Sequence, residues 1–200
     1  MKKHLFLIRH NKTARKQGEI VKNYADSDIL VFDKNEWYNK TKSLLDIKSD
    51  DNTIYSSPVK RCKQTALMLT FSKLNANQYV CLNSLKEFEM PPLDKPFTQC
   101  TKEEFEAKVK ITPAEMKQQA LQFLQYILYL DAKNIVAVSH GTFICYLQWL
   151  LRGNPDISLY DVITSKEIDM MPLDTVELVI EGDSVFNLKL LETKKCKFYE

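Results

Sequence analysis

The sequence predicts an α/β fold, a three-layer sandwich in which a mainly parallel central sheet is flanked by helices and carries an antiparallel hairpin at one edge. Short apolar runs typical of buried strands alternate with longer stretches of helical periodicity, which is the pattern of a parallel sheet covered on both faces. Two of these runs lead directly into a histidine, at residues 5–10 (LFLIRH) and 134–140 (NIVAVSH). The last two apolar runs are separated by a Gly-Asp pair, which favours a tight hairpin turn.

The composition is that of an ordinary globular protein, and we expect residues 1–200 to form a single domain. Hydrophobic residues make up 44% of the chain, charged residues 27%, and the net charge is +2. This charge gives no strong field, so we expect no nucleic-acid partner. No apolar run approaches the ~20 residues that cross a bilayer, so we expect no membrane partner either.

Cysteine usage and the amino terminus both favour a cytoplasmic protein. The five cysteines are scattered, odd in number and never spaced as C-x-x-C, which argues for a reducing compartment and against a disulfide framework. The first apolar run is too short for the core of a signal peptide and is better explained as the first strand.

The first half of the chain is expected to alternate strands with helices. Helices are expected over residues 33–45 and from Pro58, which suits a first helical turn because it lacks an N–H, to about residue 71. The polar stretch 11–30 is expected to be a long loop, and such loops are usually functional or mobile. Strands are expected at residues 3–8, 52–56 and 79–82.

Residues 88–112 are expected to act as a lid or cap over the site. This segment holds three prolines within the seven residues 90–96 (MPPLDKP), which excludes a helix or a central strand there. Capping boxes are expected to open two helices, because Thr101 and Thr112 each precede a glutamate by three residues.

The remaining elements are a strand at 134–138, a helix at 142–152 and a terminal hairpin. The hairpin strands are expected at 173–180 and 184–191, joined by Gly182 and Asp183. We find no regular pattern in residues 156–172, and the lysine-rich tail at 194–197 is expected to be a solvated terminus.

Polar residues follow the predicted strands at the points where the strands end. The chain has three histidines, and two of them stand at such points, His10 beside Arg9 and His140 after the strand at 134–138. A third segment, strand then turn then helix, carries Arg61. Because open α/β sheets bind ligands just outside the carboxyl ends of their strands, these residues are placed to form a site.

These segments, in this order and near these spacings, resemble the histidine phosphatase superfamily, the phosphoglycerate-mutase-like enzymes. The resemblance extends over about residues 3–190 and implies an α/β sandwich with its site at the carboxyl ends of the strands. The matching segments are Arg9-His10, residues 56–66 (SSPVKRCKQTA), Leu85-Lys86-Glu87 and Ser139-His140-Gly141.

The resemblance implies a metal-independent phosphomonoester hydrolase that acts through a phosphohistidine. His10 stands where the family has the histidine that attacks phosphorus. Arg9 and Arg61 supply planar guanidinium groups that match phosphate oxygens, and their charges disfavour protonation of His10. His140 would hold an oxygen that gains charge in the transition state.

The proposed acid is Glu87, which fits the family's Leu-x-Glu segment, with Glu89 as the rival. A carboxyl near a bound anion should have a raised pKa, which suits proton donation to the leaving oxygen. Thr13 is expected to add a hydroxyl contact to the phosphate. Asn11 stands where most members have glycine; asparagine tolerates the left-handed backbone region better than most residues, so the loop is expected to survive.

Two alternatives to phosphatase activity remain open at this point. A phosphoglycerate mutase is disfavoured because the glutamate of those enzymes continues into a Tyr-Gly motif, which is absent here after Glu87. A non-catalytic phosphate-binding or regulatory protein on the same fold is the second alternative, and glycine positions occupied by Asn11 and Asn35 motivate it.

No cofactor and no metal ion are expected, because the histidines lie on separate elements and no carboxylates cluster with them. The expected substrate is a small-molecule phosphomonoester or a phosphoprotein. The sequence does not choose between these, and it does not predict the oligomeric state.

Overall fold

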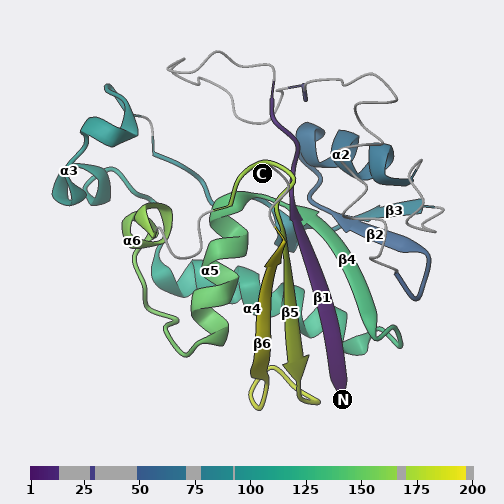
Figure 1. The fold of residues 1–200 in the computed structure, drawn as a ribbon. Coiled ribbons are helices and arrows are strands. Elements are labelled where there is room, and N and C mark those ends of the chain that lie inside the picture. The colour runs from purple at the N-terminus through teal and green to yellow at the C-terminus, as the bar shows by residue number, and fades with distance from the viewer. Residues whose placement is uncertain (14–27, 30–48, 71–77, 92, 166–169, 197–200) are drawn as a thin grey trace.

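The computed structural model describes residues 1–13, 28–29, 49–70, 78–91, 93–165 and 170–196. Within these residues, six strands form one sheet in the order β3-β2-β4-β1-β5-β6 (Figure 1). Neighbouring strands from β3 to β1 are parallel, and β5 and β6 are antiparallel additions at one edge, so the predicted fold class is confirmed. The strands are β1 Lys2–Arg9, β2 Thr53–Ser56, β3 Gln78–Cys81, β4 Asn134–Ser139, β5 Thr175–Glu181 and β6 Lys189–Cys196.

The predicted helices are confirmed wherever the structure describes them, and residues 33–45 lie outside the described residues. Helix α2 begins two residues later than expected, so Pro58 precedes the helix instead of lying in its first turn. Thr101 and Thr112 form the capping boxes expected of them. The helices are α2 Lys60–Thr70, α3 Lys102–Glu106, α4 Pro113–Tyr129, α5 Gly141–Leu151 and α6 Leu159–Thr164, with short 3-10 turns η3 Asn83–Leu85 and η4 Phe97–Gln99.

Side chains on the two faces of the sheet pack into separate hydrophobic cores. Leu5 and Leu7 of β1 belong to the larger core with α4, α5 and α6, and Ile8 belongs to the smaller core with α2. Successive residues of a strand point to opposite faces, so an apolar run such as residues 5–8 serves both cores at once. Among the described residues, no helix is both long enough and apolar enough to cross a membrane.

The register between β1 and β4 places the two candidate histidines at the same edge of the sheet. The two strands pair in parallel from His4 opposite Asn134 to Arg9 opposite Ser139. His10 therefore follows β1 at the level where His140 follows β4.

The prediction that residues 156–172 are irregular is wrong, because α6 lies within this segment. The hydroxyl of Ser158 accepts a hydrogen bond from the backbone N–H of Asp161 at 3.2 Å and caps the helix. A serine followed three residues later by an aspartate is a weak capping signal, and the helix that it opens is only six residues long.

The predicted two-residue hairpin turn at Gly182 and Asp183 is also wrong. β5 ends at Glu181 and β6 begins only at Lys189. The Oδ1 atom of Asn187 accepts hydrogen bonds from the backbone N–H groups of Asp183 and Ser184, so an asparagine side chain organises a longer loop.

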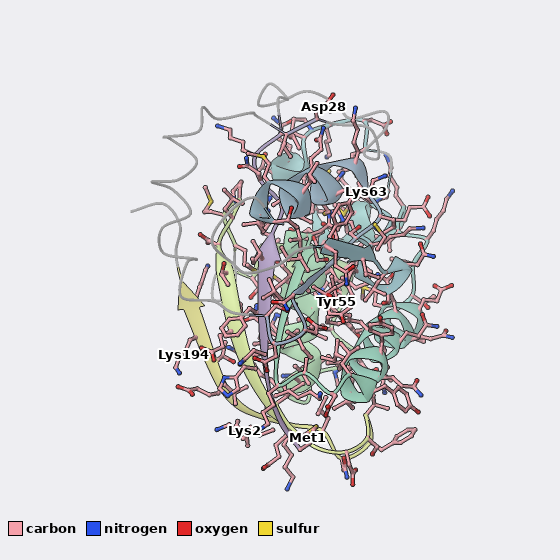
Figure 2. All side chains as sticks on the ribbon, turned by 90° about the vertical axis from the view of Figure 1, so that its right-hand side faces the viewer. Met1, Lys2, Asp28, Tyr55, Lys63 and Lys194 are labelled. Atoms are coloured by element: carbon pink, nitrogen blue, oxygen red, sulfur yellow. The ribbon has the colours of Figure 1, made fainter. Side chains whose placement is uncertain are left out.

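The lysine-rich tail continues the sheet instead of ending as a solvated terminus. β6 runs to Cys196, with Lys194 opposite Glu177 of β5. Figure 2 labels Lys194 on this outermost strand. Lysines on an edge strand discourage pairing with another chain, which explains why a strand here carries charge.

Candidate active site

Two histidine rings meet where β1 and β4 end. The backbone N–H of His10 donates to the Ser139 carbonyl at 2.9 Å, and the rings of His10 and His140 lie with centroids 5.3 Å apart, edge to face. Figure 2 labels Met1 and Lys2 at the opposite end of the molecule, where β1 begins. The site therefore lies at the carboxyl ends of the parallel strands, as open α/β sheets require.

The hydrogen bonds of His10 assign its tautomer. Nδ1 lies 2.7 Å from the Asn11 carbonyl oxygen, which only accepts, so Nδ1 carries the proton. Arg61 Nε donates to His10 Nε2 at 3.0 Å, and an arginine has no acceptor to offer. His10 is therefore held as a neutral ring with the lone pair on Nε2, the state in which imidazole is a nucleophile.

The same reasoning assigns the opposite tautomer to His140. Nη2 of Arg61 lies 2.9 Å from His140 Nδ1, so Nδ1 accepts. Nε2 then carries the proton and donates to the hydroxyl of Ser57 at 3.0 Å. His140 is fully buried, and burial together with the charge of Arg61 holds its pKa well below the usual value. One guanidinium thus fixes both histidines.

Replacing Ser57 by alanine is expected to lower the free energy of unfolding by about 1–3 kcal/mol, because it leaves the buried His140 Nε2–H with only the weakly accepting sulfur of Cys62, 3.4 Å away. Urea denaturation of Ser57→Ala, His140→Ala and the double variant gives the coupling between the two side chains. We expect the double variant to lose less stability than the sum of the single variants. Strictly additive losses would show that Ser57 does not hold His140.

The side chain of Arg9 reaches the start of α5, and one of its N–H groups there has no hydrogen-bond partner in the described part of the chain. Its Nη1 donates to the Met170 carbonyl, whereas its buried Nε has no hydrogen-bond partner among the described residues. The side chain passes so close to Gly141 that a Cβ there would lie 3.2 Å from Nε. Glycine at this position lets the guanidinium lie against the start of α5, where helix N–H groups also favour an anion.

Glu87 is held as a carboxyl that exchanges its proton near neutral pH. Burial raises its pKa to about 7, against the opposing effect of Arg61 and then Arg9. Its Oε1 accepts hydrogen bonds from the backbone N–H groups of Phe143 at 3.1 Å and Phe88 at 3.3 Å, which orient the carboxyl. A group with such a pKa is suited to act as an acid and then as a base.

A cavity of about 160 Å³ joins these groups. Arg9, His10 and Glu87 lie at one part of its wall, and the rival carboxylate Glu89 is exposed and does not line it. Arg61 does not line the cavity, and its guanidinium contacts His10 at Nε2. The remaining lining residues are Gly141, Thr142, Cys145, Val162, Ile163, Ser165 and Met170.

Neither Asn11 nor Thr13 lines this cavity. Asn11 is buried, its N–H donates to the Thr65 hydroxyl at 3.0 Å, and its side-chain oxygen accepts from the N–H of Lys12 at 2.7 Å. Asn11 does not adopt the left-handed backbone conformation, so the loop does not depend on the tolerance of asparagine for that conformation. Thr13 forms an isolated antiparallel bridge with Ile29. The contribution of Asn11 to the site is the carbonyl that orients His10.

Sequence reasoning missed Ser57 and the wall formed by α6. Ser57 belongs to a segment that was recognised, but nothing in its spacing indicates that it contacts a histidine from β4.

The described part of 88–112, which was expected to cover the site, does not line the cavity. It packs on α6 instead, through Phe97 and Phe105 against Tyr160. In the part of the chain that the structure describes, no three His, Cys, Asp or Glu side chains group as metal ligands would.

Comparisons with known proteins agree with this fold. A model of the histidine phosphatase superfamily (branch 1) matches residues 5–164, and no curated protein matches the sequence. Among solved structures, a mycobacterial glucosyl-3-phosphoglycerate phosphatase is similar, with 13% identity, a TM-score of 0.66 and coverage of 96% of this chain and 98% of that one. An Entamoeba histolytica phosphoserine phosphatase, in complex with 3-phosphoglyceric acid, has 16% identity, a TM-score of 0.65 and coverage of 99% and 100%. A mycobacterial hydrolase, hydrolase 2, has 13% identity, a TM-score of 0.69 and coverage of 94% and 88%.

Proposed function

Because the chain belongs to the histidine phosphatase superfamily, we propose that it hydrolyses phosphate monoesters through a phosphohistidine formed on His10. One observation carries the proposal. His10 is held with its lone pair on Nε2, and it shares a small cavity with the guanidinium of Arg9 and with a carboxyl of pKa about 7 on Glu87.

In the first step, Nε2 of His10 attacks phosphorus and the bond from phosphorus to the ester oxygen breaks. Glu87, protonated, gives its proton to the departing oxygen, so the product leaves as an alcohol. The phosphoryl oxygens are more strongly accepting than an imidazole, because they are charged. Arg61 therefore turns from His10 Nε2 to the phosphoryl group as it enters, and this frees the lone pair for attack.

In the second step, the Glu87 carboxylate takes a proton from water, and the oxygen of that water attacks the phosphohistidine. The bond from phosphorus to Nε2 breaks, and inorganic phosphate leaves. The Asn11 carbonyl stabilises the ring throughout, because it accepts from Nδ1 in the free and the phosphorylated states alike. Arg9 and Arg61 offset the charge of the transferring group.

Mutase activity is less well supported. A mutase must hold a second anionic group of its substrate while the phosphoryl group moves. Among the described lining residues of the cavity, Arg9 is the one cation, and it is placed beside His10. A binding protein without chemistry would have no need of a neutral, oriented His10 beside a carboxyl whose pKa is tuned to about 7.

Hydrolysis of p-nitrophenyl phosphate in the presence of a chelator, from about pH 4 to pH 9, tests the proposal. The supporting result is metal-free turnover together with phosphate on the protein that is labile in acid and stable in base, as a phosphohistidine is. Turnover that requires an added metal ion, or binding of phosphate without either signal, would overturn it.

Glu87→Gln is expected to slow phosphoryl transfer from alkyl phosphates to His10 by about 10²-fold or more and to slow transfer from p-nitrophenyl phosphate far less, because only the alkoxide needs a proton to leave. With wild-type protein, the rate of bond cleavage in alkyl phosphates should fall as pH rises through about 7, where Glu87 loses its proton. Single-turnover rates across pH measure both effects. Equal slowing of this first step with the two substrates would show that Glu87 does not protonate the leaving oxygen.

The raised pKa of Glu87 also gives a readout that does not depend on activity. The folded state favours the protonated carboxyl, so between about pH 4.5 and 7 the unfolded state binds fewer protons, and this group's contribution to stability falls as pH rises. Relative to Glu87→Gln, wild-type protein should therefore lose stability across this range. A constant difference in stability would contradict the raised pKa.

A further inference from the structure

The cavity has an ionisable part and an uncharged part. Arg9, His10 and Glu87 form the ionisable part, at the ends of the parallel strands and beside them. Every other described residue that lines the cavity is uncharged, and four of these are apolar in character: Cys145, Val162, Ile163 and Met170. A phosphoryl group held at His10 would leave its organic part facing this second wall.

The apolar wall is fixed in place by contacts behind it. Tyr160 of α6 packs against Phe97 and Phe105, with ring centroids 5.5 and 5.7 Å away. Lys102 of α3 donates to Asp161 of α6 at 2.6 Å. Figure 1 shows α3 and α6 next to each other, away from the sheet and beside α5. The side chains of α6 are therefore presented to the cavity by a supported helix.

The size of the cavity limits what this wall can contact. Its volume of about 160 Å³ is below the ~300–1,000 Å³ typical of pockets for drug-sized ligands. After a phosphoryl group is seated, a few carbon atoms fill the rest. A carboxylate placed against the apolar wall would lose its water and find no cation among the described residues there, and the neutral hydroxyls of Thr142 and Ser165 would offset this cost only in part.

We propose that α6, through Ile163, selects small phosphomonoesters whose organic part is uncharged and largely apolar. This inference rests on the proposed function for the orientation of the phosphoryl group. Ile163 suits a test because it lines the cavity and is only partly buried, so a longer side chain there has room to project.

Two phosphonates that cannot be hydrolysed test recognition separately from turnover. n-Butylphosphonate and 4-phosphonobutanoate differ only in a terminal methyl against a carboxylate, and calorimetry gives the Kd of each. We expect wild-type protein to bind n-butylphosphonate at least about tenfold more tightly, the scale of discrimination that a small pocket gives. Ile163→Lys should shift the ratio of the two Kd values at least about tenfold toward the carboxylate, because the ammonium then pairs with it.

The matched control is Thr164→Lys, which adds the same charge to the next residue of α6, an exposed one that does not line the cavity. It should leave the ratio of Kd values unchanged. If Ile163→Lys does not fold, Ser165→Lys places the charge on the same wall. Equal binding of the two phosphonates by wild-type protein, or an equal shift in Thr164→Lys, would overturn the inference. If wild-type protein shows the expected ratio of Kd values but neither turnover nor a phosphohistidine, the proposed function is overturned and this inference is not.

Discussion

His10→Ala is expected to lower turnover by at least about 10⁴-fold, the scale seen when a covalent nucleophile is removed. The covalent route through Nε2 is lost, and the two ionisable residues that line the cavity with His10 do not replace it, because Arg9 is a permanent cation and Glu87 serves the leaving oxygen. The measurement is steady-state hydrolysis of p-nitrophenyl phosphate, together with acid-labile phosphate on the protein after brief exposure to substrate.

His4→Gln is the matched control for this variant. His4 lies in the same strand, where its Nδ1 pairs with Glu177 at 2.6 Å, far from the cavity. We expect the control to keep turnover and the phosphohistidine signal. A His10→Ala protein that is folded and retains turnover within about tenfold of wild type would show that phosphorus is attacked by some other group, because removing a nucleophile costs far more.

The sequence predicted the parts of the site that stand at strand ends. His10 and His140 were recognisable because each follows an apolar run, and parallel strands bring their carboxyl ends to one edge whatever the intervening loops do. The parallel order also follows from the alternation of strands and helices. Their tautomers were not predictable, because these depend on a carbonyl, a serine and one guanidinium that come from separate segments.

The missed features depend on contacts between segments that are distant in sequence. Helix α6 has six residues, too few for its apolar period to stand out, and it is held by Phe97, Phe105 and Lys102 from the preceding third of the chain. The loop after β5 was misjudged because the side chain of Asn187, and not the Gly-Asp pair, sets its length. Local patterns carry no information about such partners.

Arg61 has one property that the sequence predicted and one that only the structure shows. Its position on α2 follows from the segment that resembles the family, whereas the structure adds that its Nε and Nη2 contact two different histidines, at 3.0 and 2.9 Å. The rigid fork of a guanidinium makes both contacts possible at once. Without a phosphoryl group, this arrangement keeps both rings neutral and oriented; in the proposed reaction, Arg61 would also supply charge to the transition state.

Arg61→Ala is therefore expected to lower kcat/KM by about 10²–10³-fold, the effect of removing a donor that stabilises developing charge. Arg61→Lys should recover only part of this loss, because an ammonium cannot donate in two fixed directions. Lys63→Ala, which removes an exposed cation from the same helix (Figure 2), is the matched control and should leave the rate unchanged.

Hydrolysis of p-nitrophenyl phosphate by the three variants, with thermal unfolding to confirm that each is folded, measures the contribution of Arg61. Wild-type activity in a folded Arg61→Ala protein would mean that the guanidinium at His10 Nε2 does not contribute to the rate. Full recovery in Arg61→Lys would mean that charge alone matters, and that the double contact with His10 and His140 plays no part in the reaction.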